Sequence, residues 1–595
     1  MNKFLSAIAA IFCFIFISGE YSVVFSQQKN FSMVLSSFEQ DAELGILWDD
    51  RVPGLVRAKP VEDHVTEGKK SLRLNFKAKK TDENGIREFK TSGLVFEGYW
   101  PFKWFDFENF KTDVFNDNET DVILSVSIGT KGGWYKKEFL LPAKKDSVIS
   151  ISFDDIRKQI PVLKNIVHSL CFTIKAADSD TTLYLDNIRL ESVKKTSDIP
   201  ANVRVTWQDN PKNSMTISWQ TTFDNEGIVE YGIYRNDKAY TDKVKSSVKR
   251  KFPGILGVFH TAKLTNLTPG MKYHYRCGDG FEWNEGLMFN TEPEANEPFV
   301  FCAGADTKWF RKELMELLNM SLIWDPKFVI YPGDAVTVGR RYMWDLWFDA
   351  LTPFASGIPV MPSTGNHELS GDPKSEDVKL YCDYNAVPEK SGTRLYYSFD
   401  YGNVHFVSLE TELSRGEYEQ FKIGDEQIRW LQNDLAKTDK KWKVVFCHSP
   451  LFSSGTSHGS DLKAREMLCP IFDKYKVNLV FGGDDHCYER SKSINISMAN
   501  NTDSTLVTES SKYKKPYSYK VYKGTIQDSY KTGTCYMVSA GMTAQTYNVT
   551  GNWWTAFCKK ITHISKVTVE NDKMTVEAVD LSGNVFDKFV LEPRN

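Results

Sequence analysis

The sequence predicts two all-β domains followed by an α/β domain, in a chain of 595 residues. Short apolar runs separated by polar turns extend from about residue 30 to residue 292, the pattern of β-sandwiches. From Glu297 onward, similar runs alternate with stretches whose apolar residues recur three and four positions apart. That alternation is typical of an α/β domain. A chain of this length also exceeds one ordinary hydrophobic core, so several domains are expected.

The N-terminus predicts export. Lys3 precedes an apolar stretch over residues 4–17, and Val24-Phe25-Ser26 offers a cleavage point. An apolar stretch of this length fits a signal peptide over residues 1–26 better than a membrane span, with an uncleaved anchor as the alternative. No later segment resembles a transmembrane span. We therefore expect a secreted, periplasmic or cell-surface protein.

Charge and cysteine usage exclude some classes of protein. The 74 Lys and Arg nearly balance the 77 Asp and Glu, so bulk charge does not favour a nucleic-acid scaffold or a membrane-surface binder. The cysteines show no CxxC spacing, and no disulfide framework is predicted. Cys302 and Cys447 lie in apolar runs and are expected to be buried thiols. Cys487, directly after His486, is a zinc ligand or another buried thiol.

The first β domain is predicted over residues 27–192. Alternating runs at residues 71–76 and 183–188 favour a sandwich or jelly roll. The strings TEGKKSL and YLDNI make it similar to the jelly-roll modules of secreted carbohydrate-active proteins. That resemblance implies a glycan partner, with Trp100 or Trp134 stacking on a sugar. The alternative is that these aromatic residues belong to the core or to domain packing.

The second β domain is predicted over residues 198–293. Its strand-like runs lie at residues 203–207, 215–219 and 229–231, and Leu267-Thr268-Pro269-Gly270 precedes Tyr273. This pattern resembles a fibronectin type III sandwich, in the version that precedes the catalytic domain of plant-type purple acid phosphatases. The buried tryptophans and the tyrosine corner are structural signals.

The third domain is predicted over residues 296–595. Helices are expected over residues 309–324, 342–354, 426–437 and 461–475, and an antiparallel hairpin over residues 564–569 and 574–579. Five polar clusters follow apolar runs of this domain: Asp306, Gly333-Asp334, Gly365-Asn366-His367-Glu368, His448, and Gly483-Asp484-Asp485-His486. Carboxylate, amide and imidazole groups at strand ends are what a metal site needs.

The order of these clusters resembles that of the metallophosphoesterase (calcineurin-like) superfamily, and within it the purple acid phosphatase-like branch. Residues 397–406 (YSFDYGNVHF) and 486–490 (HCYER) support this resemblance, which covers residues 198–595. It implies a four-layer αββα fold and a two-metal centre.

The resemblance also implies a role for each residue. Asp334 would bridge the ions, Asp306 and His486 would hold the first ion, and Asn366, His448 and Asp484 the second. His367 would contact the phosphate or protonate the leaving alcohol. His458 would be a second substrate-side histidine, with a surface-loop histidine as the alternative. Glu368 would orient its loop without being a ligand.

Two positions depart from the family pattern. Asp484 stands where the family has a histidine ligand, and Thr337 stands where purple acid phosphatases have the iron-binding tyrosine. Relatives without that tyrosine often have a histidine two residues after the first aspartate, but here that residue is Lys308. The first ion is therefore left with fewer ligands, and without a phenolate to stabilise Fe(III) we predict a colourless protein with two divalent metal ions (Fe, Zn or Mn).

The resulting hypothesis is an exported, metal-dependent phosphatase. It would hydrolyse phosphate monoesters, or also diesters, by attack of a metal-activated water. The alternative is a binding protein on a degenerate phosphatase scaffold, with a glycan-binding N-terminal module.

Overall fold

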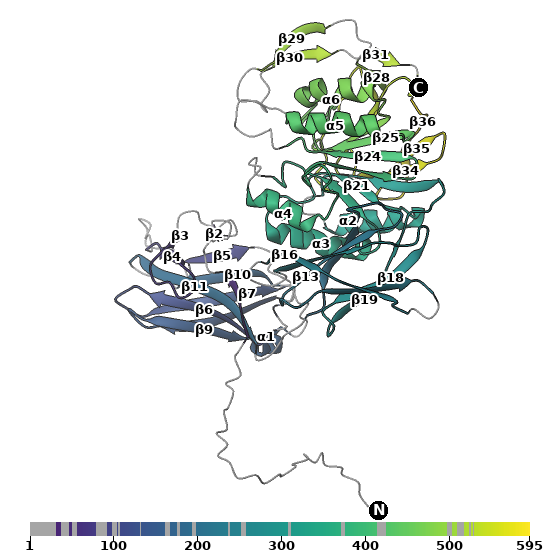
Figure 1. Ribbon diagram of the computed structural model, residues 1–595. Coiled ribbons are helices and arrows are strands. Elements are labelled where there is room, and N and C mark those ends of the chain that lie inside the picture. The colour runs from purple at the N-terminus through teal and green to yellow at the C-terminus, as the bar shows by residue number, and fades with distance from the viewer. Residues whose placement is uncertain are drawn as a thin grey trace, which may run out of the picture.

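The chain forms three units in the predicted order (Figure 1). The computed structural model describes residues 31–36, 47–49, 56–78, 92–97, 104, 107–130, 133–160, 167–174, 179–192, 198–235, 239–251, 257–307, 311–369, 375–412, 424–496, 502–508, 517–522, 525–527 and 529–594. The signal peptide, Trp100 and Lys308 lie outside these residues.

The first unit is a sandwich of two antiparallel sheets. One sheet has the order β3-β4-β11-β6-β9, with β1 also paired to β11, and the other has the order β2-β5-β10-β7-β8. The strands are β1 (Phe31–Ser36), β2 (Leu47–Asp49), β3 (Val56–Val61), β4 (Ser71–Phe76), β5 (Ser92–Glu97), β6 (Asn109–Asn116), β7 (Val122–Thr130), β8 (Gly133–Leu141), β9 (Asp146–Ser152), β10 (Val167–Ile174) and β11 (Thr181–Ser192). Helix α1 (Phe153–Gln159) follows β9, and the Ser152 side chain caps its N-terminus.

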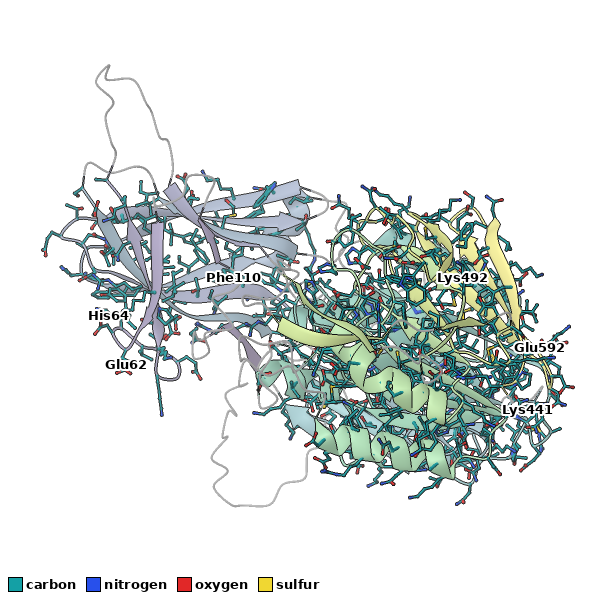
Figure 2. The ribbon with its side chains drawn as sticks, turned by 90° about the horizontal axis from the view of Figure 1, so that it is seen from above. Glu62, His64, Phe110, Lys441, Lys492 and Glu592 are labelled. Carbon is teal, nitrogen blue, oxygen red and sulfur yellow. The ribbon has the colours of Figure 1, made fainter. Side chains whose placement is uncertain are left out.

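The sandwich has a hydrophobic core of its own. In β6 alternate residues point inward, and Phe110 and Val114 among them are buried. Trp104 stacks on Phe110 inside this core. Figure 2 shows the unit as a separate lobe, with His64 and Phe110 on one side of the molecule and Lys441 on the other.

The second unit consists of two four-stranded antiparallel sheets with the orders β12-β13-β17-β16 and β15-β14-β18-β19. Its strands are β12 (Ala201–Thr206), β13 (Met215–Thr221), β14 (Ile228–Ile233), β15 (Asp242–Lys245), β16 (Ser247–Lys251), β17 (Val258–Leu264), β18 (Lys272–Gly278) and β19 (Trp283–Asn290). The Tyr273 hydroxyl accepts a hydrogen bond of 2.8 Å from the Thr268 N–H, the corner that the sequence indicated.

The third unit has two mixed sheets, with the orders β22-β21-β20-β34-β35-β36 and β23-β24-β25-β26-β32-β27-β33. The strands of the first are β20 (Phe299–Ala303), β21 (Val329–Pro332), β22 (Val360–Ser363), β34 (His563–Val569), β35 (Met574–Asp580) and β36 (Val585–Leu591). Those of the second are β23 (Tyr397–Tyr401), β24 (Val404–Leu409), β25 (Trp442–Cys447), β26 (Leu479–Gly482), β27 (Tyr488–Ser491), β32 (Cys535–Ser539) and β33 (Thr555–Lys559). Two small antiparallel sheets pair β28 (Ser493–Asn495) with β31 (Thr525–Gln527), and β29 (Thr502–Thr508) with β30 (Tyr517–Tyr522).

Helices cover the outer faces of both sheets. They are α2 (Arg311–Ser321), η3 (Leu322–Trp324), α3 (Arg341–Ala355), α4 (Glu376–Tyr384), α5 (Asp425–Lys437) and α6 (Leu462–Lys474). Successive residues of a strand serve different layers: Phe301 packs between the two sheets, whereas Cys302 packs against the α2–α3 layer. On the other sheet, Val445 packs against the α5–α6 layer. The predicted four-layer αββα arrangement is therefore confirmed.

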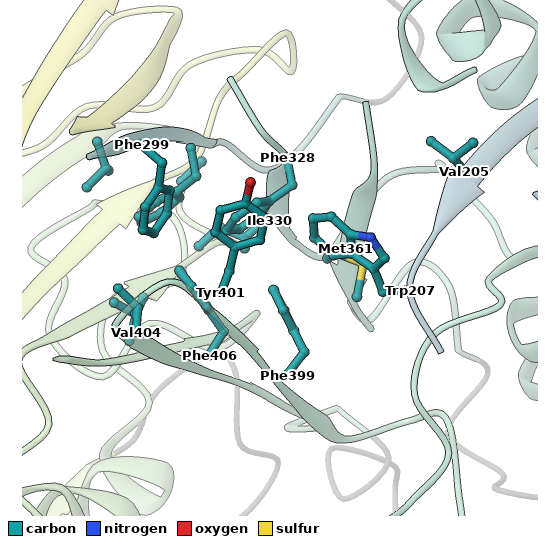
Figure 3. Close-up of a cluster of buried hydrophobic side chains, with 14 of the residues drawn as sticks. Val205, Trp207, Phe299, Phe328, Ile330, Met361, Phe399, Tyr401, Val404 and Phe406 are labelled. Carbon is teal, nitrogen blue, oxygen red and sulfur yellow. The ribbon is translucent and has the colours of Figure 1, made fainter. Parts of the chain in front are cut away.

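The second and third units share one hydrophobic core. Trp207, directly after β12, lies beside Phe328, Phe399 and Tyr401 of the third unit, with ring centroids 5.4–5.9 Å apart (Figure 3). Arg204 on β12 is fully buried, and its Nε–H donates to the Tyr384 carbonyl. The second unit is thus packed into the third as an integral part of it.

The expected helices agree closely with the observed ones, and the expected hairpin is that of β34 and β35. Helices α1 and α4 were not predicted, because each is short and offers at most two turns of apolar periodicity. No helix in the described part of the chain is long and apolar enough to cross a membrane.

Candidate metal centre

Parallel strands bring the five polar clusters to one edge of the third unit. Strands β20, β21 and β22 run parallel in one sheet, and β25 and β26 run parallel in the other. Each cluster begins within three residues of the carboxyl end of one of these strands. Because parallel strands end at the same edge, residues far apart in the sequence meet there.

Three aspartates of this edge have a left-handed backbone. The φ angles are 65° at Asp306, 55° at Asp334 and 67° at Asp484, and all three side chains are buried. Aspartate tolerates this region better than most residues, but the conformation persists only where the surrounding structure holds it. The sharp turns therefore indicate a constrained site.

A glycine permits the close approach of two of these turns. A Cβ atom at Gly365 would lie 2.3 Å from Oδ1 of Asp334 and 2.7 Å from Oε2 of Glu368. No side chain fits there, so the glycine that precedes Asn366 is required for packing against the Asp334 turn.

Glu368 holds the Asp334 loop through backbone groups. Its carboxylate accepts hydrogen bonds from the N–H groups of Asp334 (2.8 Å), Val336 (3.0 Å) and Gly365 (2.6 Å). Burial, reinforced by the Asp334 carboxylate, raises the pKa of Glu368 to about 8, and the N–H donors act in the opposite direction. This arrangement agrees with the prediction that Glu368 orients the loop.

Two backbone carbonyls orient the histidines. Nδ1 of His448 lies 2.9 Å from the Pro332 carbonyl, and Nδ1 of His486 lies 2.8 Å from the Gln545 carbonyl. A carbonyl only accepts, so each Nδ1 carries the hydrogen and donates it. The Nε2 atom of each ring is then available as a ligand, which is the usual arrangement of metal-binding histidines.

The Nε2 atoms of both rings face oxygen atoms. Nε2 of His486 lies 3.2 Å from Oδ1 of Asp306, and Nε2 of His448 lies 3.3 Å from Oδ1 of Asp334 and 3.0 Å from Oδ1 of Asn366. Oδ1 of Asp306 is buried and has no hydrogen-bond partner. Lone pairs that converge in this way repel one another unless a cation or a proton lies between them, so the residues fit a metal centre.

The charges of the site lead to the same conclusion. Burial raises the pKa of Asp306, with His486 and His448 opposing the rise. Burial also acts to raise the pKa of Asp334, but His448 outweighs it and holds this pKa below its usual value. Burial opposes ionisation of His448, yet the carboxylates of Asp334 and Asp306 raise its pKa well above the ordinary value. The cluster favours a positive charge at its centre.

Each of the six predicted ligands lies near another of them. Ligand atoms of Asp306, Asp334 and His448 all lie within 4.8 Å of one another. Oδ1 of Asp484 lies 3.8 Å from Nε2 of His448. Asn366 and His486 complete the group through the distances given above.

The two predicted substrate-side histidines lie at the exposed edge of the group. The side chains of His367 and His458 are 31% and 35% exposed, whereas those of Asp334 and Asp484 are 2% and 4% exposed. Nε2 of His367 lies 3.7 Å from Oδ2 of Asp334, and Nδ1 of His458 lies 3.9 Å from Oδ1 of Asp484. These two histidines are therefore the solvent-exposed neighbours of the buried donors.

Asp485 is a residue of the site that the sequence did not reveal. Its buried carboxylate accepts hydrogen bonds from the Ser453 hydroxyl (2.6 Å) and from the N–H groups of His458 (2.9 Å) and Gly459 (2.7 Å). It ties the His458 loop to the segment between Asp484 and His486. No spacing in the sequence indicates this contact, because the loop and Asp485 are more than 20 residues apart.

Thr337, one of the two positions that depart from the family pattern, contacts a residue of the site through its backbone. The backbone carbonyl of Thr337 lies 2.6 Å from Nδ1 of His367 and orients that ring.

Cys487 is buried beside His486, and burial raises the pKa of its thiol, so it is a neutral thiol of the core. Cys302 and Cys447 are buried as expected.

Comparisons with known proteins agree with this architecture. Residues 200–291 match the family "Purple acid Phosphatase, N-terminal domain", and residues 301–488 match "Calcineurin-like phosphoesterase". Purple acid phosphatase 21 of Arabidopsis thaliana is 32% identical over 300 residues, 48% of this chain and 65% of that protein. Purple acid phosphatase 23 of the same plant is 28% identical over 375 residues, 52% of this chain and 79% of that protein.

A solved structure has a similar fold. Purple acid phosphatase PPD1 from yellow lupin (Lupinus luteus) seeds aligns with 86% of this chain and 94% of its own, with a TM-score of 0.55 and 18% identity. The match to purple acid phosphatase 21 leaves about a third of that relative without a counterpart. By these family models, residues 301–488 are similar to the calcineurin-like phosphoesterases, and residues 200–291 before them to the N-terminal domain of the purple acid phosphatases.

Proposed function

We propose that this protein is an exported phosphohydrolase with two divalent metal ions (Fe, Zn or Mn), acting on phosphate monoesters or also diesters. The observation that carries the proposal is the buried convergence of Asp306, Asp334 and His448 at the strand ends. Homologues with calcineurin-like phosphoesterase and purple acid phosphatase domains support the class of reaction. Two ions at such a site supply an activated water and neutralise the phosphoryl oxygens.

The ligand assignment is part of the proposal. Asp334 would bridge the two ions, because its Oδ1 faces His448 and its Oδ2 faces the side of His367. Asp306 and His486, 3.2 Å apart, would hold the first ion with Asp334. Asn366, His448 and Asp484 would hold the second.

His367 would be the catalytic acid. Its Nδ1–H donates to the Thr337 carbonyl, which leaves Nε2 as the nitrogen that faces Oδ2 of Asp334, 3.7 Å away. A proton on Nε2 could be given to the leaving alcohol, which general acid catalysis requires within hydrogen-bond reach. His458, whose Nδ1 lies 3.9 Å from Oδ1 of Asp484, would bind the phosphoryl group.

Metal analysis and one hydrolysis assay test the proposal. Purified protein would be analysed for bound metal and assayed with an aryl phosphate, an aryl phosphodiester and a nucleotide, beside Asp334→Asn. We expect two ions per chain and hydrolysis that the substitution removes. Wild type that holds two ions but turns over no faster than Asp334→Asn would favour the alternative, a binding protein on a phosphatase scaffold.

The location and the domain limits are also proposals. A signal peptide over residues 1–26 would direct export, and N-terminal sequencing of the secreted protein would locate the cleavage. Domains over residues 27–192, 198–293 and 296–595 follow the three units of the fold, and limited proteolysis between the first two would test that boundary.

The N-terminal unit offers a surface for a glycan. On β8, Trp134 is 54% exposed and Leu140 is 63% exposed, and residues six apart on a strand share one face. An exposed tryptophan on a flat sheet face can stack on a sugar ring. We propose glycan binding at this face. Affinity electrophoresis of wild type and Trp134→Ala in polysaccharide gels tests it, and equal mobility of the two proteins in every gel would contradict it.

A further inference from the structure

Tyr547 covers one of the proposed metal ligands. Its ring stacks on the imidazole of His486, with centroids 4.2 Å apart and planes inclined by 15°. The Tyr547 N–H also donates a hydrogen bond of 2.8 Å to the His486 carbonyl. Tyr547 thus contacts both the side chain and the backbone of His486.

The same tyrosine lies against the substrate-side loop. Its ring centroid is 5.7 Å from that of His458, and its hydroxyl is hydrogen-bonded with the Ser457 side chain. The neighbouring backbone pairs as well, through Thr456 N–H to the Asn548 carbonyl (2.9 Å). Tyr547 therefore stands between His486 and His458.

The segment that carries Tyr547 also makes hydrogen bonds to both residues proposed to hold the first ion, Asp306 and His486. We call residues 542–549 the clamp segment. The Ala544 N–H donates to the Asp306 carbonyl at 2.9 Å, and the Gln545 carbonyl accepts from Nδ1 of His486 at 2.8 Å. Both protein ligands proposed for the first ion alone are thus held by this one segment.

We propose that Tyr547 is a positioning residue, which fixes the His486 ring as a ligand and sets the His458 loop against it. The inference rests on the proposed function and deepens it. A stacked neighbour restricts rotation of the imidazole, and the Gln545 carbonyl holds Nδ1, so that Nε2 is directed toward Asp306. This support matters most for the first ion, because Thr337 supplies no phenolate there.

Two substitutions separate the ring from the hydroxyl. Tyr547→Phe keeps the stacking and removes the contact with Ser457, whereas Tyr547→Leu removes both. Tyr396→Leu is the matched control, because Tyr396 is a half-buried tyrosine of the same unit that contacts Trp430, with ring centroids 5.0 Å apart.

Zinc binding is the first measurement. Metal-free protein would be titrated with Zn²⁺ against a chromogenic chelator. We expect Tyr547→Leu to bind one of two ions about tenfold more weakly, and Tyr547→Phe and Tyr396→Leu to match wild type. Wild-type affinity at both sites of Tyr547→Leu would overturn the role of the ring. If Tyr547→Leu does not fold by circular dichroism, Tyr547→Met takes its place.

Hydrolysis of an aryl phosphate is the second measurement. We expect Tyr547→Phe to raise KM several-fold with little change in kcat, because the His458 loop loses its link. A wild-type KM would overturn the role of the hydroxyl. Wild type that binds two ions without hydrolysing any substrate would contradict the proposed function. The role of the Tyr547 ring would still be tested, because the zinc titration does not depend on turnover.

Discussion

Nε2 of His486 lies 3.2 Å from Oδ1 of Asp306, while the Nδ1–H of the same ring donates to a backbone carbonyl. The pair is buried, and either a cation or a proton has to lie between the two atoms. This geometry fits a pair of metal ligands in the first half of the site. The second half has more donors, since Asn366 and Asp484 both lie near His448.

We therefore predict unequal affinity for the two ions. Dialysis against a mild chelator should remove one ion before the other, because the first has fewer protein ligands. His486→Ala should retain one ion per chain and His448→Ala should lose the more tightly held one. Metal analysis after each dialysis step checks this, and simultaneous loss of both ions from wild type would contradict it.

The protein should be colourless when loaded with iron. The family's tyrosine is replaced by Thr337, so the phenolate ligand that gives the charge-transfer band is absent from that position. The visible absorption spectrum of the iron-loaded protein checks this. A band that disappears in Tyr547→Phe would show instead that Tyr547 supplies a phenolate.

Removing the Asp485 carboxylate should impair substrate binding. Asp485→Ala frees the N–H groups of His458 and Gly459, and a displaced loop should lower kcat/KM by about 10- to 100-fold, mainly through KM. Steady-state kinetics with an aryl phosphate measures the effect.

Asp473→Asn is the control for Asp485→Ala, because Asp473 is a buried carboxylate that binds Arg594 and lies outside the cluster. An equal change of KM in both variants would indicate general destabilisation.

His405 should stabilise the fold in a pH-dependent way. Although burial opposes it, hydrogen bonds with Asp400 (2.7 Å) and Asp434 (2.9 Å) raise the pKa of His405 to about 9. A raised pKa means that the folded state holds the proton more tightly. The contribution is complete below pH ~6.5 and is lost as the pH rises through about 9, roughly 2 kcal/mol after allowing for the exposure of Asp400.

Urea unfolding at pH 6 and pH 10 tests this window. His405→Gln should cost more at pH 6 than at pH 10. His260→Gln is the control, because burial lowers the pKa of His260 to about 4 and its charge does not change in this range. An equal pH effect in both variants would refute the role of His405.

Trp207 should be essential for the stability of the third unit. Trp207→Ala should reduce the free energy of unfolding by about 3–5 kcal/mol, because its ring fills the shared core beside Phe328 and Tyr401. Trp283→Ala is the control, since Trp283 lies half-buried on β19 under Arg276. Unfolding curves of both variants give the comparison, and a similar small loss in both would contradict shared packing.

Local patterns were enough to predict most elements of the fold. The short apolar runs that became β20, β21, β22, β25 and β26 each end at a turn, and the polar residues after them identified the candidate ligands. This succeeded because a parallel sheet sends every carboxyl end to one edge, so position along each strand already implies proximity. Short helices such as α4 have too few turns for their apolar periodicity to be recognised in the sequence.

The sequence by itself determined the kinds of donor and the strand ends on which they stand, from Asp306 to His486. Only the tertiary structure decided which nitrogen of His486 faces Asp306, which loop Asp485 holds and which ring Tyr547 covers. These contacts join segments 27 to 61 residues apart across loops, and loops carry no periodic pattern. Which residues make these contacts depends on the packing of the whole unit. The orientation of the site's side chains is therefore set only in the folded chain.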